Sequence, residues 1–148
     1  MEVSKQDWKL FREKISAWQE SYMEKLNNEY ITLLEGEGKP AEKFWALEKR
    51  IKSDKRHKGV LIEMRKQNMP FDLVDLIRDG VIGCKDLQDF SSELKETIKF
   101  LIGNEVYFKL QEAEQKLEIT KECYSPKDVL KSLRATIRDK EYGSTKLK

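Results

Sequence analysis

The fold is decided by the stretch Ser4–Gly36, which reads SKQDWKLFREKISAWQESYMEKLNNEYITLLEG. Ser4 followed by Asp7 is typical of a helix N-cap, and a glycine at position 36 is typical of the residue that follows a helix. Between these ends, large apolar residues recur at gaps of three or four and therefore share one stripe of a 3.6-residue helix. They are Trp8, Phe11, Ile15, Trp18, Tyr22, Leu26, Tyr30 and Leu33.

This spacing predicts a helix of about 30 residues and about 45 Å, with the first five apolar residues on one buried face. Such a helix is longer than a domain of this size is wide. We therefore expect it to be a spine along which the other helices pack, or to extend into a partner.

Glycine and proline divide the next part of the chain into shorter patterns. Pro40 suits the first turn of a second helix, whose expected buried stripe is Phe44, Leu47 and Ile51. The segment 60–68 is predicted as a third helix, although its Val-Leu-Ile start would also suit a short strand.

Further helices are expected after residue 69. A short helix runs from Pro70 to Gly80, and a longer one begins at Asp86. The Gly-Asn pair at 103–104 interrupts the apolar stripe, so we expect a hinge or kink there rather than one straight rod. Ser-Pro-Lys-Asp starts a last helix over 125–143.

These elements predict an all-α protein, a compact bundle of five to six helices built on the long N-terminal helix. We expect a helical core over 1–102, a C-terminal helical hairpin over 103–143 packed on it within one domain, and a disordered tail over 144–148. Of the 148 residues, 38% are charged and 39% hydrophobic. This composition is too apolar for a disordered chain, and it suits helices with a narrow buried stripe.

A resemblance to small, charged, helical bacterial proteins with no assigned activity is carried by the pattern Phe44-Trp45-x-Leu47-Glu48-x-Arg50-Ile51-Lys52-x-Asp54-Lys55, followed by Gly59-Val60. It continues through Leu76-Ile77-x-Asp79-Gly80-Val81-Ile82 into Asp86-Leu87-x-Asp89-Phe90-Ser91, and covers about residues 4–102. The portion 80–90 also resembles the hairpin of short bacterial helical modules that oligomerise. The resemblance implies a bacterial or mobile-element setting and brings no activity.

Several classes of protein are excluded by composition. No apolar run approaches the ~18 residues of a membrane span, and the first residues lack the apolar region of a signal peptide, so we expect a cytoplasmic protein. A net charge of +2 argues against coating DNA by charge alone, although the charged residues within 49–66 are mostly basic and those within 72–96 mostly acidic. Cys84 and Cys123 have no metal or redox spacing, and we expect both to be reduced.

No catalytic residue, metal ligand or cofactor is expected, and we predict that the protein is not an enzyme. His57, the only histidine, lies among the cations of 55–58 and is expected to be a solvated loop residue rather than a general base. Asp72, Asp75 and Asp79 share one helix face, but the spacings of calcium loops and di-iron sites are absent. We expect a solvated acidic face there. No phosphate-binding glycine loop, zincin, kinase or hydrolase signature appears.

Two basic stripes are the candidate binding residues. On the second helix, Trp45, Lys49, Lys52 and Arg56 fall at i, i+4, i+7 and i+11, about 130° from the apolar stripe. The last helix repeats this spacing with Lys127, Lys131, Arg134 and Arg138. Such stripes suit a phosphate backbone or an acidic protein groove, and Trp45 could stack on a base. Alternatively, Trp45 widens the core face and the cations only keep the surface hydrated.

The favoured function is therefore a non-enzymatic helical protein that acts as a regulator or adaptor by docking to another protein. A nucleic-acid-binding protein that uses the basic stripes is the alternative. A third hypothesis, an inhibitor of a nucleic-acid-handling enzyme encoded on a mobile element, comes from the bacterial resemblance alone. We expect a protein partner, with nucleic acid as the second candidate and no membrane. The sequence is also compatible with a homo-oligomer.

Overall fold

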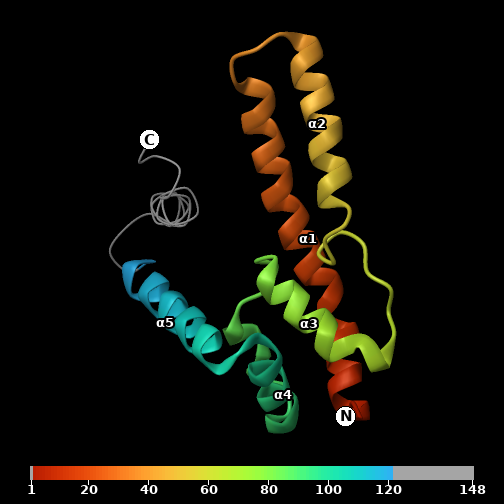
Figure 1. The fold of residues 1–148 in the computed structure, drawn as a ribbon, viewed down its shortest axis with the longest axis vertical. Helices are drawn as coiled ribbons and strands as arrows, with labels where there is room; N and C mark the ends of the chain where they lie inside the picture. The colour runs from red at the N-terminus through yellow and green to blue at the C-terminus, as the bar shows by residue number, and fades with distance from the viewer. Residues whose placement is uncertain (1, 122–148) are drawn as a thin grey trace. The chain divides into compact units, whose positions relative to one another are not determined.

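The computed structural model of this chain describes residues 2–121, whose regular secondary structure is entirely helical (Figure 1). The helices are α1 (Lys5–Glu35), α2 (Pro40–Asp54), α3 (Met69–Arg78), α4 (Ser92–Ile102) and α5 (Asn104–Lys121). Two short 3₁₀ turns, η1 (Lys66–Asn68) and η2 (Cys84–Leu87), lie between them. The all-α prediction with a long N-terminal helix is confirmed.

The chain divides into two compact units, residues 1–107 and residues 108–148. Helix α5 begins in the first unit and continues into the second, of which residues 108–121 belong to the described part. The hairpin predicted over 103–143 lies mostly outside the described residues, and the tail over 144–148 lies entirely outside them. The core and the candidate site are both in the first unit.

Helix α1 begins and ends where the sequence predicts. The Asp7 N–H donates a hydrogen bond of 3.1 Å to the Ser4 Oγ, and the helix ends one residue before Gly36. Three members of the predicted buried face are buried: Phe11, Ile15 and Tyr22.

The two tryptophans of that face are only half-buried, contrary to the prediction. The Trp8 ring stacks on Phe11 with centroids 6.0 Å apart, and the Trp18 ring lies 6.4 Å from that of Phe90. Each indole therefore covers the edge of the core with one side, while the other side meets solvent.

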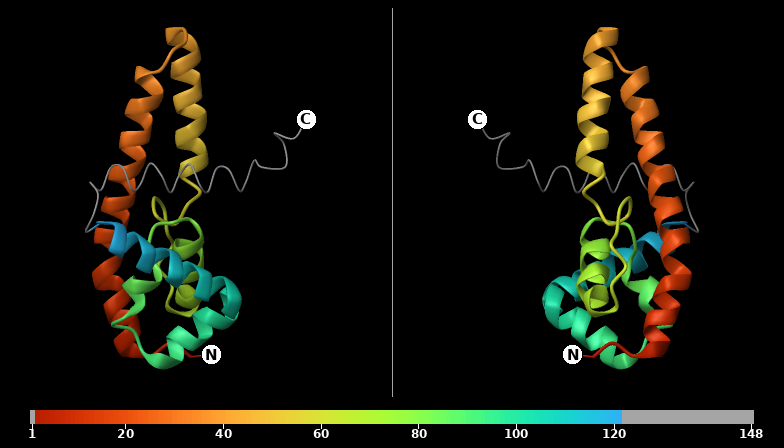
Figure 2. Two further views of the ribbon diagram at one scale, coloured as in Figure 1. Left: turned by 90° about the vertical axis from the view of Figure 1, so that its left-hand side faces the viewer. Right: turned by 90° about the vertical axis from the view of Figure 1, so that its right-hand side faces the viewer.

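The core lies beside the first half of α1, where α3 packs against α4 (Figures 1 and 2). Its largest fully buried side chains are Phe11, Met69, Leu73, Leu76, Leu87, Leu94 and Ile98. The buried Asp7 carboxylate links the first turn of α1 to the residue that precedes α4. It accepts hydrogen bonds from the Ser91 N–H at 2.9 Å and from the Ser91 O–H at 2.5 Å. The first turn of α1 is thereby fixed to the residue that starts α4.

The segment 60–68 is neither the predicted helix nor the alternative strand. It is an irregular loop, and only its last three residues form the 3₁₀ turn η1. The N–H groups of Val60 and Leu61 both bond to the His57 carbonyl, which closes a turn. Leu61 is 63% exposed and Met64 38% exposed. Since these two side chains are not buried against the core, they do not provide the packed face that would stabilise a helix here.

The predicted start of the helix at Asp86 is also wrong. Residues 84–87 form η2, and α4 begins after Ser91, whose Oγ accepts the Leu94 N–H at 3.3 Å. The serine is the stronger cap because it also bonds Asp7, a contact that the local sequence does not contain. At the other end Gly103, with φ +99°, closes α4, and the predicted break before α5 is confirmed.

Helix α2 returns antiparallel along the second half of α1, and this two-helix hairpin projects beyond the core (Figures 1 and 2). Pro40 occupies the first turn of α2, as expected. Beyond Leu26 no residue of α1 is buried, and in α2 only Asp54 is buried. The hairpin therefore has little core of its own.

Candidate functional site

A polar cluster at the base of the hairpin holds α2 against α1. The buried Asp54 carboxylate accepts the Tyr30 O–H at 2.6 Å and the Arg50 Nε–H at 3.0 Å. Arg50 also forms an ion pair with Glu29 of α1. Arg50 and Asp54 are thus occupied in fixing the register of the two helices.

A second cluster joins the end of α2 to the core. Tyr22 Oη and His57 Nδ1 share a hydrogen bond of 2.7 Å, and the Lys58 Nζ lies 2.8 Å from Asp72 and 2.6 Å from Asp75. Gly59 is buried beside them. These contacts correct two expectations. His57 is a half-buried, hydrogen-bonded residue rather than a solvated one. The acidic face is solvated only in part, because Asp72 is buried against Lys58, whereas the Asp75 side chain is 42% exposed.

Two tyrosines of these clusters make the free energy of unfolding depend on pH in the alkaline range. Burial raises the pKa of both Tyr22 and Tyr30 to about 12, with the nearby Asp54 as a further cause. A tyrosine whose pKa is higher in the folded than in the unfolded state contributes fully to the free energy of unfolding below pH ~10. That contribution is lost as the pH rises to ~12. We expect the difference in unfolding free energy between the parent and a Tyr22→Phe/Tyr30→Phe variant to narrow between pH 9 and 12. Urea unfolding at each pH measures it, and a constant difference would contradict the assignment.

The outer face of α2 is exposed along its whole length. Trp45 is 63% exposed, and the other members of the predicted stripe, Lys49, Lys52 and Arg56, are exposed as well. No carboxylate in the described part of the chain lies within ion-pair distance of these three cations. Trp45 meets Phe44 edge-to-face at 5.1 Å and does not widen the core.

The apolar stripe of α2 is uncovered too, which corrects the expectation that it is buried. Phe44 is 63% exposed, and Leu47 and Ile51 are only half-buried. The reason is the hairpin itself: α2 packs against α1, and among the described helices no other covers the rest of its apolar surface. The periodicity correctly predicted that these side chains share one face of α2. The expectation that this face is buried required a further layer of helices to cover it.

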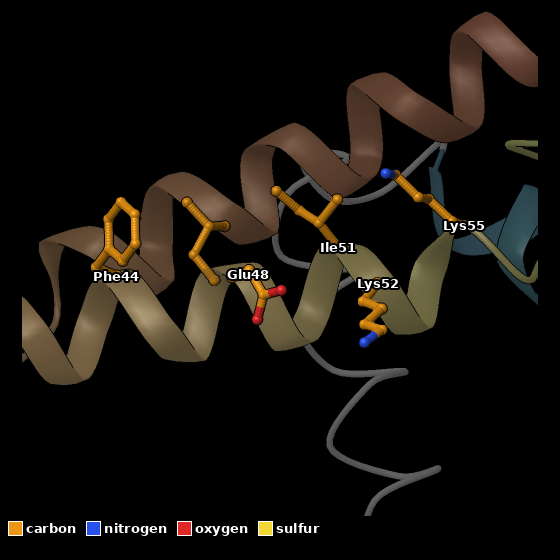
Figure 3. A pocket seen from close by; sticks show the side chains of 6 residues that line it. Phe44, Glu48, Ile51, Lys52 and Lys55 are labelled. Atoms are coloured by element: carbon orange, nitrogen blue, oxygen red, sulfur yellow. The ribbon is translucent and has the colours of Figure 1, made fainter.

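A shallow groove with a volume of about 450 Å³ lies along this side of α2 (Figure 3). Its lining residues are Phe44, Leu47, Glu48, Ile51, Lys52 and Lys55. Phe44, Ile51 and Lys55 point toward α1, whereas Glu48 and Lys52 point away from it (Figure 3). The lining contains no nucleophile paired with a base.

The predicted stripe is exposed, but its last member, Arg56, lies beyond the end of α2 at Asp54, and the groove beside the stripe was not predicted. Lys52 belongs to both, whereas Phe44, Glu48 and Lys55 were not among the predicted binding residues. No signal in the sequence indicated the groove, because the segment 60–68 that follows α2 was itself predicted as a helix. The second predicted stripe, Lys127, Lys131, Arg134 and Arg138, lies outside the described residues.

No protein-family model, curated protein or solved structure matches this chain. Within residues 2–121, no helix is long and apolar enough to cross a membrane.

Proposed function

We propose that this protein is a non-enzymatic helical interaction protein that docks an acidic partner protein on the exposed face of α2. The observation that carries the proposal is the set of exposed cations Lys49, Lys52 and Arg56 beside the exposed rings of Phe44 and Trp45. Clustered aromatic side chains with cations at their rim are typical of protein interfaces.

A comparison within α2 supports a binding role for these cations. Arg50, on the side of the helix that faces α1, pairs with Glu29 and Asp54 and stabilises the hairpin. Lys49, Lys52 and Arg56 have no such pairing in the described part of the chain. Their charge is available to a partner.

Nucleic acid is the second candidate, because Trp45 shares its stripe with three cations and an exposed indole can stack on a base. A protein is preferred because of the adjoining groove. Its aliphatic floor, Leu47 and Ile51, offers nothing to a phosphate backbone but can receive apolar side chains.

The test is the triple reversal Lys49→Glu, Lys52→Glu, Arg56→Glu. We expect binding of the acidic partner to weaken by at least ~10-fold, because three attractions become repulsions. The unfolding free energy should change by less than ~0.5 kcal/mol for each substitution, because the side chains are exposed. Quantitative affinity capture from the native host identifies the partner, and circular dichroism checks the fold.

A matched control reverses three exposed lysines of α1, Lys5, Lys9 and Lys25, and so changes the net charge equally. A protein captured by the parent and by this control, but not by the α2 reversal, supports the proposal. Retention of every captured protein by the α2 reversal would refute it. Oligonucleotide binding is measured alongside: a salt slope that falls by ~0.9 log units per lost phosphate contact would favour nucleic acid.

A further inference from the structure

The two halves of α1 are covered unequally. In the first half Phe11 and Ile15 are buried, whereas the second half packs against α2 and has no buried residue beyond Leu26. As a result Ile31, Leu33 and Leu34 of α1 are 37–52% exposed. Among the described residues, no further helix buries these side chains.

We propose that the groove of α2 receives one amphipathic α-helix of the partner, which packs antiparallel to α2 and carries its acidic residues in its first turn. This inference rests on the proposed function and deepens it by specifying the partner's binding element.

A helical occupant follows from the backbone of the hairpin. Both helices satisfy their own backbone groups, and the described part of the chain contains no strand to which an extended peptide could add. A segment that enters an apolar groove must therefore bond its own backbone, as a helix does. From Phe44 to Lys55 the lining residues follow one helix for 11 positions, or about 17 Å, which three turns of an added helix would cover.

The orientation follows from the distribution of charge. Exposed aromatic rings lie at the start of α2, at Phe44 and Trp45, and exposed cations concentrate at its end, at Lys52, Lys55 and Arg56. The occupant must therefore place acidic residues near the end of α2 and apolar residues near its start. Acidic residues are favoured in the first turn of a helix by its dipole, so an antiparallel orientation satisfies both requirements.

Charge argues against two other occupants. The chain's own residues 125–143 contain Lys127, Lys131, Arg134 and Arg138 and are net positive, as is the exposed part of α2. A second copy of the chain would likewise bring more cations than carboxylates to the shared interface, because Glu42 and Glu48 are outnumbered on this helix. Repulsion between like charges disfavours both arrangements.

The test uses synthetic peptides of about 16 residues, held helical by lactam bridges, with an apolar stripe at i, i+3 and i+7. One carries glutamates in its first turn, a second carries them in its last turn, and a third has lysines in place of the first-turn glutamates. Fluorescence anisotropy with the full chain should give the lowest Kd for the first peptide and a Kd at least ~10-fold higher for the third. Equal binding of the first and third peptides would overturn the inference, and tighter binding of the second would overturn the orientation.

Matched variants locate the binding. Phe44→Ala should weaken the first peptide by about 10-fold, whereas Phe100→Ala, at a site 81% exposed on α4, should leave its Kd unchanged. Sedimentation velocity of the chain alone tests whether a second copy occupies the groove. A dimer that is present in the parent and lost in Phe44→Ala would show this and overturn the inference. If the α2 reversal releases its partner but no peptide binds, the proposed function stands and this inference fails. A reversal that releases nothing would overturn the proposed function itself.

Discussion

Leu94→Asp is expected to unfold the protein. Leu94 is 0% exposed, and it lies on α4 where α3 packs against that helix. The substitution removes a fully buried leucine, which costs about 2–5 kcal/mol, and adds a carboxylate with no partner in the core. The sum is comparable to the whole stability of a domain of this size, about 5–15 kcal/mol. Loss of the far-ultraviolet helical signal and of cooperative thermal unfolding would report the result.

Leu61→Asp is the matched control, because it makes the same chemical change at a site 63% exposed in the loop after α2. Its unfolding free energy should stay within about 0.5 kcal/mol of that of the parent. A Leu94→Asp protein that keeps the parent's melting transition would show that α3 and α4 do not pack through this residue.

Gly59→Ala is expected to destabilise the fold by about 2–3 kcal/mol, at the upper end of the usual cost of overpacking. An added Cβ would lie less than 3 Å from the Tyr22 ring and 2.6 Å from the Val81 Cγ2. Neither neighbour can move freely, since Tyr22 is buried and hydrogen-bonded to His57, and valine is stiff about χ1. The measurement is the midpoint of urea unfolding.

The control for this prediction is Gly36→Ala. At that position φ is −67°, and the closest atom to an added Cβ, the Leu33 carbonyl oxygen, is 3.4 Å away. We expect a change within about 0.5 kcal/mol. Equal midpoints for the two alanine variants would contradict the close packing of Gly59 between α1 and the segment that follows α3.

Features that depend on neighbours in the sequence were predictable. The Ser4 cap, the end of α1 before Gly36, the proline start of α2 and the break at Gly103 all follow from residues within a few positions of each other. Helix capping is a local property, so the sequence contains the information that determines it.

Features that depend on distant pairs were not predictable. Ser91 starts α4 partly because it bonds Asp7, 84 positions away, and Asp72 is buried because Lys58 reaches it across a loop. Part of the candidate site was likewise predictable from the sequence, and part was not. The angle between the stripes of α2 correctly placed Lys49 and Lys52 in solvent. Periodicity could not reveal that Phe44 is 63% exposed, because it reports which side chains share a face and not what lies opposite them.

Because α1 is one continuous helix, a change of its tilt at the core also moves the hairpin at its far end. One helix of 31 residues, about 46 Å long, passes from the packed side chains around Phe11 to the loop at Gly36. A tilt of about 5° at the core would displace the far end of such a rod by about 4 Å. The direction in which α2 faces is therefore set by packing at the opposite end of α1. We therefore expect small substitutions around Phe11 or Leu94 to redirect the α2 face without altering any of its residues.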